Sequence, residues 1–207
     1  MKKNPQSADS KILHNIYGHH RGWVFTPDHF KGLGSRDAIA SALKRHKRAG
    51  IIRQLGRGLY DYPKEHPKLG VLSPPVEEVA KALAGRDAIR LQPTGAYAAN
   101  LLGLSTQVPM KVVYLTDGVS RTVKVGDQEI ILKRTTPKNM ACAGRISGMV
   151  IQALRYLGRE HVDERVVDQL DQRLDKTACD QLMKDIRYAP SWIAALFREL
   201  ACRKEMA

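Results

Sequence analysis

Residues 36–48 constrain the fold more than any other part of the sequence, because they combine a helical pattern with clear start and stop signals. Ser35 precedes the segment as a capping residue, and Gly50 follows it, where glycine commonly ends a helix. At about 100° per residue, Ile39 and Leu43 fall on one side of the helix, whereas a serine and three basic residues gather on the other. The residues of this second side are Ser41, Lys44, Arg45 and Arg48. The sequence therefore predicts a helix that docks through one face and exposes a cationic one.

The flanking sequence predicts a small module around this helix. The expected elements are a helix at 7–17, a strand at 22–26, a short helix at 27–31, a glycine turn at 32–34, and two strands at 51–55 and 58–62 joined at Gly56-Arg57. Three helices with a tight turn before the last, followed by a basic hairpin, make the winged helix-turn-helix arrangement. In such a module the cationic third helix fits the major groove of DNA, and an arginine at the hairpin tip reaches a phosphate or the minor groove.

Charge is concentrated in the same part of the chain. The 207 residues include 34 Lys and Arg against 21 Asp and Glu, a net charge of +13. Residues 1–68 hold 14 of the basic and 5 of the acidic residues, which gives +9, whereas residues 69–207 have a net charge of only +4. We therefore expect a basic DNA-binding domain at 1–68 and a nearly balanced second domain at 69–207, separated by a linker rich in proline and glycine.

Eight residues are candidates for DNA contact on these grounds: Arg36, Ser41, Lys44, Arg45, Lys47, Arg48, Arg53 and Arg57. Lys47 lies nearer the docking side of the helix, so it is expected to touch a phosphate rather than to read a base. His46 flanks the docking side, and we interpret it as a packed residue rather than a ligand or a switch.

Several classes of protein are excluded by the sequence. No apolar stretch approaches the roughly 18 residues that a membrane-spanning helix needs. The basic N-terminal segment 1–6 is followed by polar residues and lacks the apolar core of a secretory signal, so a cytoplasmic protein is expected. Three widely separated cysteines predict neither a disulfide framework nor a zinc site, and we expect no metal and no cofactor.

Residues 69–207 predict a small mixed α/β domain with a helical C-terminus from about residue 144. Helices are expected at 75–84 and 95–102, and strands at 88–91, 111–116, 120–125 and 128–133. Further helices are expected over 146–157, 162–174, 177–187 and 191–203. The fold class of the whole chain is therefore predicted to be α+β.

One pair of carboxylates in this second domain raises the question of catalysis. Asp117 and Glu129 on neighbouring strands are similar to the acids of metal-dependent nucleases. In that fold a lysine follows two residues after the second acid, and here Ile131 occupies that position, so we interpret both acids as turn and edge residues of a hairpin. The chain is therefore expected not to be an enzyme, and a metal-dependent nuclease remains a remote alternative.

Three stretches of the sequence resemble the AbiEi-type antitoxins of type IV toxin-antitoxin systems. They are Gly56-Arg57-Gly58-Leu59-Tyr60, the block Ser73-Pro74-Pro75 followed by Gln92-Pro93-Thr94-Gly95-Ala96-Tyr97-Ala98-Ala99-Asn100-Leu101-Leu102-Gly103-Leu104-Ser105, and Lys111-Val112-Val113-Tyr114-Leu115-Thr116-Asp117-Gly118. The resemblance covers about residues 7–140 and leaves the helical tail unmatched.

This resemblance implies a repressor that binds its own promoter through the winged helix and counteracts a nucleotidyltransferase-like toxin encoded beside it. Direct contact with the toxin is not implied. The alternative is a stand-alone winged-helix regulator whose second domain senses a ligand or forms a dimer. Binding to DNA as a homodimer on a palindrome and binding as cooperative monomers on repeats both remain open.

Overall fold

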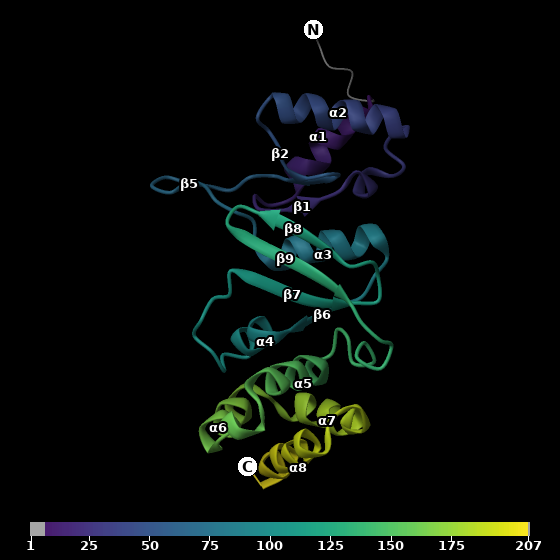
Figure 1. Ribbon diagram of the computed structural model, residues 1–207. Helices are drawn as coiled ribbons and strands as arrows, with labels where there is room; N and C mark the ends of the chain where they lie inside the picture. Colours follow the sequence, from purple (N-terminus) through teal and green to yellow (C-terminus); the bar gives the residue numbers. More distant parts are fainter. Residues whose placement is uncertain (1–6, 207) are drawn as a thin grey trace. The chain divides into compact units, whose positions relative to one another are not determined.

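The computed structural model describes residues 7–206, so the basic segment 1–6 lies outside the described residues (Figure 1). The chain forms two compact units. Unit 1 comprises the chain up to Ala88 together with Val123–Gln128, and unit 2 comprises Ile89–Thr122 and the chain from Glu129 onward. Both units contain helices and strands, which confirms the α+β class.

Unit 1 begins with alternating helices and short strands. Its elements are α1 (Ala8–Gly18), β1 (Val24–Phe25), the 3-10 helix η1 (Pro27–Phe30), α2 (Arg36–Arg48), β2 (Arg53–Gly56) and β3 (Leu59–Asp61). The strands form an antiparallel sheet in the order β1-β3-β2. A two-stranded hairpin of β4 (Glu65–His66) and β5 (Gly70–Val71) follows, and then α3 (Val76–Asp87).

Local sequence explains where these helices start. The hydroxyl of Ser35 accepts a hydrogen bond from the backbone N–H of Ala38 at 3.2 Å, and Ser7 caps α1 in the same way through Ser10. The bounds of α2 match the predicted 36–48. The expected helix at 27–31 is a single 3-10 turn that begins at Pro27, as the preference of proline for the first helical turn suggests.

An aromatic and aliphatic core holds unit 1 together. α1 and α2 contribute their apolar faces, and β1 and η1 contribute aromatic rings. The buried members are Ile12, Ile16, Trp23, Phe25, Phe30, Ile39, Ala42, Leu43 and Ile52. His46 is 2% exposed among them, which confirms that it is a packed residue.

The division of the chain differs from the boundary expected between Lys68 and Leu69. The β4–β5 hairpin spans that position, with Glu65 paired to Val71, and α3 packs against β1. The proline and glycine residues that suggested a linker therefore shape a hairpin within unit 1. The compact unit continues to Ala88, where a backbone φ of 51° ends α3.

The second sheet of the chain consists of β6 (Leu91–Thr94), β7 (Lys111–Thr116), β8 (Arg121–Val125) and β9 (Gln128–Arg134), in the order β6-β7-β9-β8. Unit 2 contains β6, β7 and nearly all of β9, whereas most of β8 belongs to unit 1. β6 pairs antiparallel with β7, whereas β7 and β9 are parallel. The strand expected at 88–91 is therefore displaced to 91–94, because α3 continues to Asp87 and its capping residue Ala88 cannot extend a strand. The short helix α4 (Gly95–Leu101) follows β6 directly.

Among the described residues, unit 2 continues with the α-helices α5 (Ile146–Leu157), α6 (Glu164–Arg173), α7 (Lys176–Lys184) and α8 (Ser191–Met206), and with the 3-10 helices η2 (Arg159–His161) and η3 (Ile186–Tyr188). They lie together at the C-terminal end of the chain in Figure 1, and α5 packs against α4, β6 and α7. Asp163 and Asp175 cap α6 and α7 through their carboxylates. Within residues 7–206, no helix has both the length and the apolar composition that crossing a membrane requires.

Candidate nucleic-acid interface

The exposed face of α2 carries a short column of uncompensated basic charge. Ser41, Lys44 and Arg48 are all exposed, and they follow one another at intervals of about one helical turn. Among the described residues, neither Lys44 nor Arg48 makes a side-chain hydrogen bond or ion pair. Their charged groups are therefore available to an external anion, whereas the opposite face of α2 is fixed in the core by Ile39 and Leu43.

Arg45 lies at the edge of this face and contacts α1. Its Nε and Nη2 atoms donate to Oδ1 of Asp9 at 3.1 and 2.9 Å, and its side chain remains 57% exposed. Nε2 of His46 lies 3.4 Å from the same carboxylate oxygen. Asp9 therefore balances part of the charge of Arg45 and orients its guanidinium along the α1–α2 contact.

Lys47 and Arg36 lie beside the column of Lys44 and Arg48 on the surface of α2. Lys47 is exposed, and its Nζ donates to Oε1 of Gln54 at 2.7 Å, so β2 orients the ammonium group. Arg36 is exposed at the first position of the helix. Both side chains flank the column of Lys44 and Arg48 rather than forming part of it.

Arg53, unlike Lys44 and Arg48, makes an ion pair within unit 1. Its Nε and Nη2 donate to the two carboxylate oxygens of Asp61 at 3.1 and 2.6 Å, and Nη2 also donates to the carbonyl of Leu72 at 2.9 Å. Asp61 is only 1% exposed. Two donors of Arg53 thus serve a buried carboxylate, and its contact with DNA stays a prediction.

Arg57 occupies the turn between β2 and β3 and is exposed, as expected. Its carbonyl accepts a hydrogen bond from Nη1 of Arg86, in α3, at 3.3 Å. Gly58 follows with a φ of 67°, a conformation that glycine adopts without strain. The tip therefore presents one arginine side chain on a backbone that α3 supports.

Three side chains that contact these basic residues were not predicted from the sequence. Asp9, Asp61 and Arg86 each lie far along the chain, or in another element, from the group they contact. No local periodicity marks such pairs. Successive side chains of a strand point to opposite faces, so Asp61 shares a face with the apolar Leu59 two residues before it. This spacing could have indicated that Asp61 points inward.

The family model of DUF6088, a family of unknown function, matches residues 11–182 of the chain. The protein belongs to the DUF6088 family. No curated protein matches the sequence. The match spans α1 to most of α7, so it includes the basic face of α2 as well as the sheet of unit 2.

The histidines near the end of α1 form a further electrostatic feature of this DUF6088 protein. The ring of His19 stacks on Trp23 with the ring centroids 3.6 Å apart. Burial lowers the pKa of His19, and the neighbouring His20 and His29 lower it further. The stacked ring is therefore held toward its neutral form.

The two acids considered for metal-dependent cleavage lie far apart in unit 2 of the DUF6088 chain. Asp117 follows the last residue of β7, whereas Glu129 pairs with Lys111 at the first, which separates them by roughly 20 Å along the strand. Asp117 accepts hydrogen bonds from N and Nε of Arg90, both at 2.8 Å, and this contact lowers the pKa of the carboxyl. Glu129 lies 3.5 Å from Nζ of Lys111. The structure does not bring the pair together, and no three His, Cys, Asp or Glu side chains within residues 7–206 are grouped as metal ligands.

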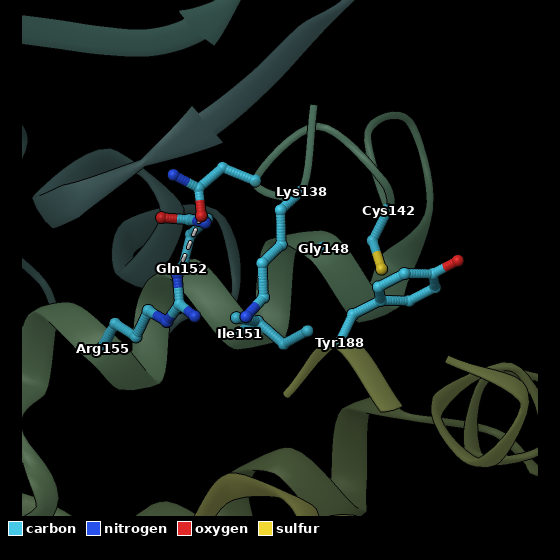
Figure 2. A pocket seen from close by; sticks show the side chains of 8 residues that line it. Lys138, Cys142, Gly148, Ile151, Gln152, Arg155 and Tyr188 are labelled. Carbon is cyan, nitrogen blue, oxygen red and sulfur yellow. Dashed lines mark hydrogen bonds between the residues drawn. The ribbon is translucent and has the colours of Figure 1, made fainter. Parts of the chain in front are cut away.

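A small cavity in unit 2 lies beside α5 (Figure 2). Its volume is about 10 Å³, space for a single water molecule. Nη1 of Arg155 lies 3.4 Å from Oδ1 of Asn139, and both residues line the cavity together with Lys138 (Figure 2). Burial raises the pKa of the Cys142 thiol in its wall, which keeps that sulfur protonated and unreactive. This cavity is too small for an organic ligand.

Proposed function

We propose that this protein is a DNA-binding transcriptional repressor that acts in the cytoplasm, with unit 1 as a winged helix-turn-helix. The observation that carries the proposal is the exposed face of α2, where Lys44 and Arg48 have no acidic partner among the described residues while the opposite face is buried. The element order α1, β1, η1, α2, β2, β3 supports it, because α2 then occupies the place of the recognition helix and the β2–β3 turn that of the wing.

The dimensions and side chains of α2 suit the major groove. The groove is about 12 Å wide and admits one helix. Ser41 is small and polar, so the backbone of α2 could approach the base edges near its N-terminal half. Lys44 and Arg48, one and two turns further on, would then contact phosphates or guanine, and Arg57 would contact the backbone or the minor groove beside it.

The proposed sequence of events is autoregulation. Binding of unit 1 to the promoter of its own operon excludes RNA polymerase, and the operator is read by the residues of α2. Two copies on a palindrome or on direct repeats would double the number of phosphate contacts, and α2 would be used in the same way in both cases.

We further propose that unit 2 provides antitoxin activity against a nucleotidyltransferase-like toxin encoded nearby, without a requirement for a stable complex. The support is the resemblance to AbiEi-type antitoxins, whose Gln92–Ser105 block falls on β6 and α4 and whose second block falls on β7. A stand-alone regulator with a dimerising second unit is the other candidate. Co-expression with the adjacent reading frame distinguishes them, because an antitoxin restores growth to cells that a toxin arrests.

Fluorescence anisotropy with a labelled duplex tests the DNA-binding proposal. The duplex contains the region upstream of the coding sequence, and an unrelated duplex of equal length measures non-specific affinity. We expect the upstream duplex to bind at least tenfold more tightly, and Ser41→Glu to abolish the difference because a carboxylate then faces the bases. Equal affinity for both duplexes would contradict a sequence-specific repressor.

A further inference from the structure

A second basic arm leaves unit 1 in the form of the β4–β5 hairpin. Residues 64–71 are exposed throughout, and Figure 1 shows this hairpin projecting away from the three-stranded sheet. Leu69 at its tip is 73% exposed and Val71 is 51% exposed. Lys64 and Lys68 are the basic residues of the hairpin, and Glu65 is its only acid. Large apolar side chains at the end of a cationic arm indicate a binding function, because no residue among 7–206 covers them.

The base of the hairpin is fixed to the same sheet that supports α2. Tyr62 N donates to Trp23 O at 2.9 Å, and Leu72 N donates to Lys64 O at 2.8 Å. Arg53 joins the sheet to the hairpin, because it pairs with Asp61 of β3 and donates a hydrogen bond to the carbonyl of Leu72. The guanidinium that the sequence assigned to DNA thus anchors an arm, and the arm cannot swing independently at its base.

The tip is shaped by His66. Its Nδ1 accepts hydrogen bonds from the backbone N–H groups of Lys68 and Leu69 at 3.2 and 3.3 Å. Gly70 closes the turn with a φ of 71°. With only two residues in each strand, the ladder alone would be weak, so these contacts determine where Leu69 points. His66 is therefore a positioning residue for the tip.

We propose that the β4–β5 hairpin is a second DNA-contacting arm, in which Lys64 and Lys68 bind phosphates and Leu69 enters the minor groove beside the site read by α2. Apolar side chains at the ends of minor-groove arms wedge between base steps, and flanking lysines contact the phosphates on either side. A second copy of this chain is a poorer occupant, because its own residues 1–68 carry +9 and would repel the arm. This inference rests on the proposed DNA binding of α2.

Two variants test the arm on the upstream duplex. Lys64→Ala combined with Lys68→Ala should lower the slope of log affinity against log salt concentration by about 1.8, since each lost phosphate contact contributes about 0.9. The matched control, Lys176→Ala with Lys184→Ala on exposed α7 positions, should leave the slope unchanged. All four lysines are exposed, so their replacement should not affect folding. Circular dichroism checks that both variants are folded.

Insertion of Leu69 is measured with 2-aminopurine placed at successive positions of the duplex. Wild-type protein should raise the fluorescence at one step beside the α2 site at least twofold, and Leu69→Ala should remove the rise, whereas Val108→Ala, an equally exposed valine of unit 2, should not. His66→Ala should lower the signal, and His66→Asn, whose Oδ1 can accept the same backbone N–H groups, should restore it.

Three other outcomes would overturn the proposal that the hairpin contacts DNA. If the hairpin variants leave salt slope and fluorescence unchanged while Lys44→Ala with Arg48→Ala lowers the slope, the arm is wrong and the α2 interface stands. If neither pair of substitutions changes the slope, both proposals fail. If Leu69→Ala shifts the sedimentation of the free protein from dimer to monomer and changes no DNA property, the hairpin is a protein contact and the inference is overturned.

Discussion

Arg53 and Arg48 show how much the partner of a side chain decides its role. Both are arginines of the basic module, and composition treats them alike. Arg48 extends from a helix face with no partner among residues 7–206, whereas Arg53 satisfies the buried carboxylate of Asp61. A pattern of residue types predicts which face of a helix is exposed, but it does not predict an ion pair between strands.

Replacement of Arg53 separates stability from DNA binding. In Arg53→Met the carboxylate of Asp61 stays buried without its cation, so the free energy of unfolding should fall by about 2 kcal/mol. This value is smaller than the cost of breaking a fully buried ion pair, because Arg53 is 35% exposed and solvent screens its charge. Urea denaturation measures this loss. In a chain that already carries Lys64→Ala and Lys68→Ala, so that the hairpin no longer contributes, Arg53→Met should leave the salt slope of DNA binding by α2 unchanged. A slope reduced there by a full phosphate contact would show that Arg53 itself contacts DNA.

His19 provides a pH dependence with a defined sign. Its pKa in the folded chain lies below the ordinary value of about 6.5, so the unfolded chain binds more protons between those two values. The contribution of the neutral His19 ring to the free energy of unfolding is complete above pH 6.5, and it is lost as the pH falls toward the pKa that His19 has in the folded chain. Phe at this position keeps the stack on Trp23 and cannot titrate. We therefore expect the unfolding free energy of His19→Phe to fall less steeply between pH 7 and 5.5 than that of the wild type, and identical slopes would refute this.

At the scale of elements, the sequence predicts most of the fold. The bounds of α2, β7 and α5 agree with their apolar periodicity and their capping or stop residues. The prediction fails at two places. β6 starts later than expected because Ala88 ends α3 in a left-handed conformation. The β4–β5 hairpin occupies a segment whose prolines suggested a linker. The exposed basic face of α2 follows from periodicity, whereas the ion pairs that Asp9 and Asp61 make do not.

A buried carboxylate in unit 2 is one such contact and yields a prediction. Asp185 is 2% exposed and accepts hydrogen bonds from Arg145 at 2.5 Å, from Gln181 at 2.9 Å and from the hydroxyl of Ser147. It thereby joins the start of α5 to the end of α7. Asp185→Ala leaves the buried hydroxyl of Ser147 without its acceptor, so the unfolding free energy should fall by about 2–4 kcal/mol.

The matched control is Asp180→Ala on the exposed face of α7, which should change stability by less than about 0.5 kcal/mol. Equal effects of the two substitutions in thermal or urea unfolding would show that the network around Asp185 contributes nothing.

For the whole molecule, the position of the domain boundary has a direct consequence. A fragment ending at Lys68 lacks the Leu72 carbonyl that Arg53 binds, the second strand of the hairpin, and α3, whose Arg86 supports the β2–β3 turn. A fragment ending at Ala88 retains all three. We expect the longer fragment to unfold cooperatively at a clearly higher temperature by circular dichroism, and equal melting temperatures would place the boundary at Lys68 after all.

If α2 presents its cationic face to DNA, the affinity must depend on salt through Lys44 and Arg48. Anisotropy titrations of the upstream duplex between 50 and 200 mM salt, a range over which phosphate contacts dominate the change, compare the wild type with Lys44→Ala combined with Arg48→Ala. We predict that the slope decreases by about 1.8, while Lys176→Ala with Lys184→Ala retains the wild-type slope. An unchanged slope in the α2 variant would show that this face of α2 does not bind DNA.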